Sequence, residues 1–347
     1  MKASYVSSYS VNLALRSSTA RLQARLPDLQ QEMVTGLHAD SGMSLGSQTA
    51  TLAKVKNDIT NIERLYDTNN RVMTRMSMAQ SGLKQLNTIA QEVVNAIGLT
   101  LGDDSQKGAV ATSAQNAVME LTSVLNRQAD GIYLFAGDNA DTQPVIEYEG
   151  TALQAAFDTA FQTYFGFPKT DAATAGITAA QVNDFITTVA EPLFLGAGWT
   201  TNVSSASDNL QKARVEDGQT VDVSVSANED AFQQIAIGSI LASEFYQTEI
   251  GGEGLFAVGE YASETVATAI SGLTKIQGQL GLREERVSRA NDSLSVQKDL
   301  FETYVVDLDG VDAYQAAIEV NTLITQIEVS YSVTSRIQNL SLIQFLR

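Results

Sequence analysis

The two ends of this chain each carry one line of mostly apolar side chains at helical spacing. The steps along each line alternate between four and three residues, which is typical of a coiled-coil seam. The N-terminal line comprises Leu15, Thr19, Leu22, Leu26, Leu29 and Met33. The C-terminal line comprises Ala313, Ala317, Val320, Ile324, Ile327, Tyr331 and Thr334. Because an apolar stripe must be covered, each end is expected to pack against the other end or against another copy of the chain.

Longer apolar lines run through both halves of the chain. One extends from Leu52 to Ile97 and predicts a helix of about 46 residues, or roughly 70 Å. The other extends from Val266 to Leu308. Helices of this length are typical of coiled coils, and antiparallel pairing of the two halves would bring both termini to one end. The sequence therefore predicts a mainly α fold, in which the N- and C-terminal halves form a long antiparallel helical coiled-coil rod.

Three residues interrupt these apolar lines. Pro27 lies inside the N-terminal line, where it is expected to remove one backbone hydrogen bond and kink the helix. Asn69 and Gln80 lie on the longer line. Polar residues on a seam can fix its register, but the same two residues could instead mark places where the seam drifts towards solvent.

The composition changes between residues 138 and 228. Three of the four prolines and the single tryptophan lie there. Residues 145–150 and 221–226 have strand character, and residues 153–165 have the pattern of a short helix. We expect a small mixed α/β domain inserted at the tip of the rod. The predicted segments are 1–45, 46–137, 138–228, 229–308 and 309–347.

Charge and composition disfavour several classes of function. The formal net charge of −18 makes nucleic acids and anionic membranes poor partners. The absence of cysteine excludes disulfides and thiolate metal sites. The N-terminus lacks the apolar core of a Sec-type signal, so we expect a cytoplasmic protein or one that is exported by another machine.

The chain offers few residues for catalysis. Its one histidine, His38, lies in a glycine-rich stretch and reads as a solvated loop residue. No phosphate-binding loop is present. Residues 307–312 are acidic but lack the spacing of a calcium loop, so a helix cap or hinge is expected there. We predict no enzyme activity and no catalytic, cofactor or metal residues.

Five stretches are similar to motifs of one protein family. They are residues 29–36, 131–137, 221–228, 280–287 and 339–346. With these motifs the chain resembles the bacterial flagellin superfamily, in particular its hook–filament junction proteins. The stretch Gly131-Ile-Tyr-Leu-Phe-Ala-Gly137 is the most specific. The resemblance covers both helical halves, whereas residues 151–217 match no pattern of the family.

The resemblance implies a structural role in the flagellum, connecting hook to filament. It implies self-assembly into a ring of about eleven copies, with the hook or the other hook-associated junction protein, filament flagellin and an export chaperone as further partners. It also implies an extracellular, secreted protein that is exported by the flagellar type III apparatus, without a cleaved signal peptide and without a cofactor. The expected assembly interface comprises Leu15, Leu22, Leu26, Leu29, Ile324, Ile327, Tyr331, Ile337, Leu342 and Phe345.

Three alternatives stay open at this point. The chain could be a filament flagellin, although residues 35–44 lack the D-D-A-A-G box of that type. It could be an intracellular coiled-coil adaptor. Finally, the insert could bind a ligand such as a glycan through Phe165, Phe167 and Trp199, which requires these aromatic side chains to be exposed.

Overall fold

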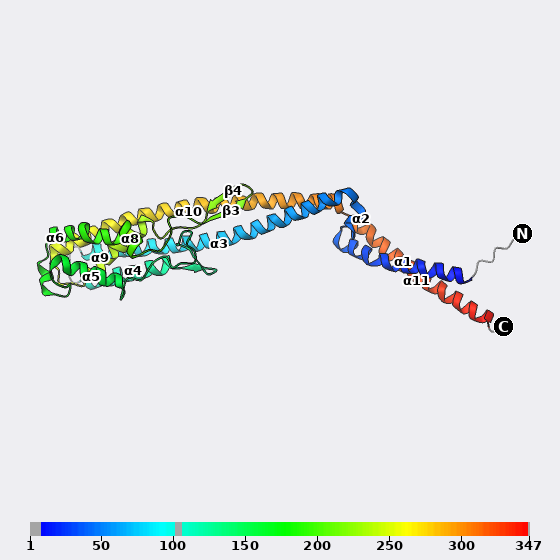
Figure 1. Ribbon diagram of the computed structural model, residues 1–347, viewed down its shortest axis with the longest axis horizontal. Helices are drawn as coiled ribbons and strands as arrows, with labels where there is room; N and C mark the ends of the chain where they lie inside the picture. Colours follow the sequence, from blue (N-terminus) through cyan, green and yellow to red (C-terminus); the bar gives the residue numbers. More distant parts are fainter. Residues whose placement is uncertain (1–7, 101–105, 346–347) are drawn as a thin grey trace. The chain divides into compact units, whose positions relative to one another are not determined.

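The computed structural model describes residues 8–100 and 106–345, and most of these residues lie in helices, four of which are long (Figure 1). The helices are α1 (Ser8–Thr35), α2 (Ser41–Leu45), α3 (Thr49–Thr100), α4 (Lys107–Leu125), α5 (Ala152–Phe165), α6 (Ala179–Phe185), α7 (Glu191–Phe194), α8 (Ala197–Asn202), α9 (Asp230–Phe245), α10 (Gly252–Asp309) and α11 (Ala313–Phe345). The strands are β1 (Gln128–Ala129), β2 (Ile132–Tyr133), β3 (Lys212–Glu216) and β4 (Gln219–Asp222). The prediction of a mainly helical chain with a small mixed insert is confirmed.

The chain forms two compact units. Residues 1–64 and 293–347 form one, here called the terminal unit, and residues 65–292 form the other, the middle unit. The long helices α3 and α10 each contribute to both units. The predicted five-segment division remains a prediction.

The long helices pair antiparallel in each unit. In the middle unit, the Gln80 amide donates to the carbonyl oxygen of Gln277 at 2.8 Å. Asn69 is fully buried, and its amide donates to the Asn291 side chain at 2.8 Å and to the carbonyl oxygen of Val215 at 2.9 Å. Asn69 therefore does not mark a drift of the seam towards solvent. A shift of one residue along α3 would leave this buried amide without its partners, so Asn69 favours a single register.

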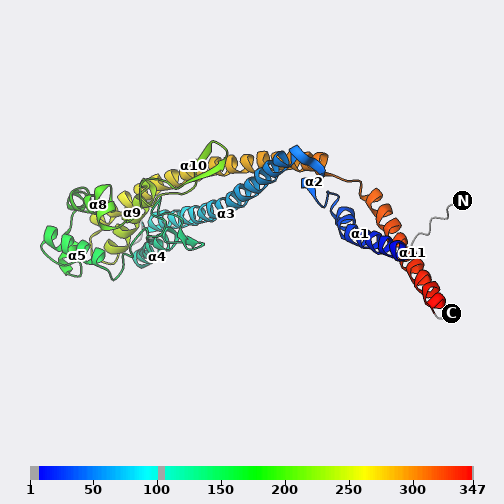
Figure 2. The ribbon, with the colours of Figure 1, turned by 45° about the vertical axis from the view of Figure 1, so that its right-hand side comes forward.

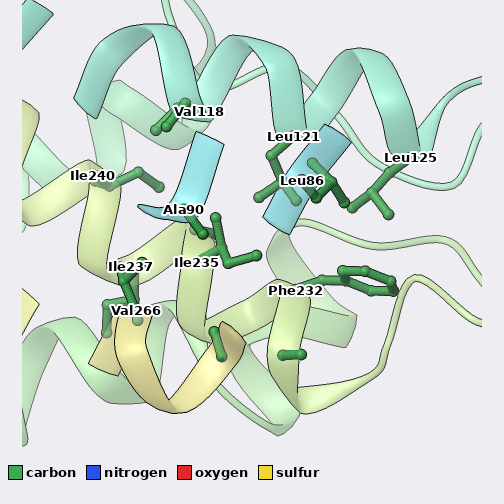
Figure 3. Packing of buried hydrophobic residues seen from close by; sticks show 14 of the residues in the cluster. Leu86, Ala90, Val118, Leu121, Leu125, Phe232, Ile235, Ile237, Ile240 and Val266 are labelled. Carbon is green, nitrogen blue, oxygen red and sulfur yellow. The ribbon is translucent and has the colours of Figure 1, made fainter. Parts of the chain in front are cut away.

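The middle unit holds the main hydrophobic core. It lies between α3, α4, α9 and α10, and Figure 3 shows Leu86 and Ala90 among side chains of α4 and α9. Helix α9 is buried along nearly its whole length, and its buried polar side chains include Gln233 and Glu244, which are hydrogen-bonded. Phe135, which follows β2, packs edge-to-face against Phe232 of α9 with ring centroids 5.8 Å apart. The segment after the first hairpin is thereby fixed to the core.

The insert differs from its prediction in one segment. The predicted short helix is α5, and the predicted strand at residues 221–226 overlaps β4, which pairs antiparallel with β3. Residues 145–150 do not form a strand, and only Val145 makes an isolated bridge, to Ser204. The Asn126 side chain bonds both the N–H and the carbonyl oxygen of Val145. This side chain satisfies the backbone groups that a neighbouring strand would otherwise satisfy.

Two glycines of the motif at residues 131–137 have positive φ. In the β1–β2 hairpin, Asp130 and Gly131 have φ angles of 54° and 77°, as a two-residue type I′ turn requires. At Gly137 φ is 68°, and a Cβ atom would lie 2.2 Å from the carbonyl oxygen of Ser207. A Cβ at Gly131 would meet no atom within 4 Å. Gly137 is therefore required for close packing as well as for its backbone conformation.

Gly137→Ala is expected to destabilise the protein by about 2–4 kcal/mol, because left-handed strain and steric overlap with the backbone of Ser207 add together. Gly131→Ala serves as the matched control, since it introduces the strain without the overlap, and is expected to cost about 1–2 kcal/mol. Urea denaturation of the purified proteins would measure both. Equal costs for the two variants would contradict the close approach at Gly137.

Candidate functional site

Helices α1 and α11 of the terminal unit pack side by side and run antiparallel (Figure 2). Their contact buries Leu29 of α1 against Val320 and Leu323 of α11. Leu22, Leu26 and Ile327 pack against this cluster and are partly buried. The only charged contact described between the two helices, Arg25–Glu319 at 3.3 Å, is exposed, so it contributes less than about 1 kcal/mol. The pairing of α1 with α11 therefore depends on a small apolar seam.

The N-terminal residues predicted for the assembly interface lie at or near this contact within the chain, and their role between copies stays a prediction. Leu22, Leu26 and Leu29 face α11, and Leu15 is partly buried. α1 also continues through Pro27 without a break in the helix. The ring of Pro27 lies on the exposed side of α1. The proline therefore does not interrupt the apolar contact.

The C-terminal half of the predicted seam needs a correction. The buried line runs through Ala316, Val320, Leu323 and Ile327. It shares Val320 and Ile327 with the predicted line but contains Leu323 in place of Ile324, which is 37% exposed. Tyr331 is 55% exposed, and its hydroxyl accepts a hydrogen bond from the Gln23 amide of α1. Apolar residues lie on both sides of the shared positions, so the spacing alone could not show which side α1 covers. The structure does not describe the side chains of Ile337, Leu342 and Phe345.

Helix α11 carries further apolar side chains away from α1. Tyr314, Ile318, Val329 and Val333 are exposed by 77%, 50%, 56% and 38% respectively. At about 100° per residue, these four residues share a face that is turned away from the buried line. α11 is thus apolar on more sides than α1 covers. Thr322 and Thr325, which are also exposed, separate the two pairs on this face, so it is mixed rather than continuously apolar. The exposed apolar side chains on it make it a candidate surface for contact with another copy.

The loops that join these helices to the rest of the terminal unit are held by Asp309. Its side chain is fully buried, and the carboxylate accepts hydrogen bonds from the Ser41 hydroxyl at 2.7 Å and the Lys56 ammonium at 3.4 Å. Its backbone carbonyl accepts from the N–H of His38 at 2.9 Å. Asp312 accepts from the N–H groups at the start of α11. The acidic stretch therefore caps α11 and anchors the loop, as expected, and His38 contributes a backbone contact.

The aromatic residues proposed for glycan binding are not exposed. Trp199 is 1% exposed, and its indole N–H donates to the carbonyl oxygen of Ala227 at 3.2 Å. Phe165 and Phe167 are partly buried against the core of the middle unit. The hypothesis of a ligand site on these three side chains is wrong, because their rings are used in packing.

Comparisons with known proteins locate two matching regions. The family pattern described as the bacterial flagellin N-terminal helical region matches residues 6–140, and that of the C-terminal helical region matches residues 264–346. Together they span well over half of the chain. No curated protein matches it. Among solved structures, a candidate flagellar hook-associated protein from Vibrio parahaemolyticus is 13% identical with a TM-score of 0.40, over 76% of this chain and 94% of that one.

Proposed function

This chain belongs to the bacterial flagellin family, and on that premise we propose that it is the junction component that connects the flagellar hook to the filament. Membership of the family makes it a structural component of the bacterial flagellum. Among the described residues, no helix combines the length and apolar character that a membrane crossing needs.

The observation that carries the proposal is the excess apolar surface of α11. One face packs against α1 within the chain, and the face with Ile318 and Val329 is left open. A neighbouring copy presents the same pair of helices and can cover that face. Contacts between unlike faces build rings or helical tubes rather than closed dimers. A ring of about eleven copies is the form that the resemblance implies.

Two sequence features support a junction protein rather than a filament flagellin. The motif from Gly131 to Gly137 resembles the junction type. Its Phe135 packs in the core of the middle unit, and its Gly137 lies against the backbone of Ser207. The D-D-A-A-G box of filament flagellins is absent from residues 35–44. On this proposal the ring meets the hook, or the other hook-associated junction protein, on one side and filament flagellin on the other. A type III apparatus with a dedicated chaperone delivers the chain outside the cell.

Electron microscopy of a strain that lacks this gene would test the junction role. Hooks are expected to remain while filaments are lost, and unassembled flagellin is expected in the medium. Immunogold labelling of the wild type is expected to mark only the point where the hook meets the filament. Labelling along the whole filament would assign the chain as a filament flagellin instead. A deletion strain with normal filaments would exclude the junction role.

A further inference from the structure

The middle unit contains a cavity that the assembly role does not use. Its volume is about 740 Å³, within the range of about 300–1,000 Å³ that is typical of ligand sites. It lies between α4, the segment before α5 and the C-terminal end of α9, which is the region at the left of Figure 2. The cavity is separate from the terminal helix pair.

The floor of the cavity is a polar cluster around Glu244. This carboxylate belongs to α9, and its side chain is only 7% exposed. It accepts hydrogen bonds from the Tyr148 hydroxyl at 2.9 Å and the Gln154 amide at 3.1 Å, and it forms an ion pair with Lys169. Burial, and then the nearby Glu244 carboxylate, raise the pKa of Tyr148. Tyr148 therefore stays protonated and remains a donor to Glu244.

The charge of Lys169 is already matched within the cluster. Its ammonium contacts Glu244 and lies 2.7 Å from the Asp158 carboxylate. Because two carboxylates already neutralise its charge, Lys169 attracts an anionic ligand only weakly. The cavity is therefore not suited to phosphate or carboxylate ligands.

The rim of the cavity is acidic, and one wall is apolar. Glu147 and Glu149 on the rim are both exposed, and Glu149 accepts a hydrogen bond from the Gln115 amide at 2.7 Å. Three glutamates thus line the cavity against one lysine. Val118 and Met119 of α4 form the apolar wall, and Met119 is 49% exposed. This arrangement suits a ligand with a positive head and an aliphatic stem.

A bare divalent cation fits the same cavity poorly. Calcium needs about six to eight oxygen ligands that converge at about 2.3–2.6 Å. Here Glu244 is engaged by three donors on the floor, whereas Glu147 and Glu149 lie on the exposed rim.

We propose that this cavity binds a primary aliphatic amine, with its ammonium between Glu147 and Glu149 and its methylene chain along Val118 and Met119. A lysine side chain of a bound peptide and a free diamine share this chemistry. Either ligand would replace the solvent at the rim with a charge-assisted contact and would cover Met119.

Isothermal titration of the purified full-length chain would test this. The probes are cadaverine, Nα-acetyl-lysine methylamide, which keeps its side-chain ammonium, 1-pentanol and N-acetylglucosamine. Each is titrated at low salt. Both amines are expected to bind with a Kd in the millimolar range, because the carboxylates that meet the ammonium are exposed, while the uncharged alcohol and the sugar do not bind. Tighter binding of the capped lysine would identify a peptide as the source, and tighter binding of cadaverine would identify a free diamine. Binding of pentanol as strong as that of cadaverine, binding of the sugar alone, or no binding of any probe would overturn the proposal.

Charge-neutralising variants locate the site. The double variant Glu147→Gln/Glu149→Gln is expected to weaken cadaverine binding at least tenfold without unfolding the protein, because both residues are exposed. Glu260→Gln/Glu264→Gln is the matched control, since Glu260 and Glu264 are exposed acids of the same unit that do not line the cavity. If this control weakens binding as much as Glu147→Gln/Glu149→Gln, the effect is one of net charge and the proposed site is wrong.

Discussion

Replacing Ile327 by aspartate is expected to prevent assembly onto the hook while leaving export intact. Ile327 packs against Val320 and Leu323 at the contact between α1 and α11. A carboxylate at this partly buried contact loses hydration without gaining a cationic partner, which destabilises the pairing of α1 with α11, and the seam has few other apolar residues to offset that loss. Counts of filaments by electron microscopy, together with the amount of secreted protein in the medium, would measure the effect.

The neighbouring change Glu328→Gln is the control for this prediction. Glu328 is exposed and lies off the seam, so its substitution is expected to change stability by no more than about 0.5 kcal/mol and to leave filament number unchanged. If Ile327→Asp assembled normally, or if Glu328→Gln were the damaging change, the face assigned to the contact would be incorrect.

Val329→Asp is expected to prevent assembly by a different route. Val329 is 56% exposed on the face of α11 that is turned away from α1. In the isolated chain the aspartate stays hydrated, so the free energy of unfolding should change by no more than about 0.5 kcal/mol. In the assembly the same carboxylate would be buried against a neighbouring copy, where it costs several kcal/mol. Chemical denaturation of the monomer and filament counts would measure the two effects separately.

The conservative variant Val329→Ile keeps the face apolar and is expected to assemble normally. The combination of a stable Val329→Asp monomer with lost filaments would distinguish a contact between copies from a contact within the chain. Normal filaments with Val329→Asp would show that this face of α11 remains in solvent after assembly. Loss of monomer stability would show instead that Val329 belongs to the fold of the chain itself.

The apolar periodicity was sufficient to predict the long helices. The line from Leu52 to Ile97 corresponds to α3, and the line from Val266 to Leu308 corresponds to α10. Residues spaced by three and four lie on one side of a helix whatever their surroundings, so this part of the fold is local. The N-terminal seam was predictable for the same reason, because α1 has one dominant apolar side that contains Leu22, Leu26 and Leu29.

Contacts between residues that are distant in the sequence decided which side of α11 is buried, whether Trp199 is exposed, and where the cavity lies. Leu323 and Ile324 are adjacent and both apolar. Leu323 is buried and Ile324 is exposed because α1 packs on the side of α11 that carries Leu323. Trp199 could have been a ligand platform, but packing of the insert buries it. The cavity beside Glu244 joins residues that are more than a hundred positions apart in the sequence. Local spacing determines which side of a helix is apolar. Which apolar side is buried, and which polar groups meet, depends on the tertiary neighbours that compete for them.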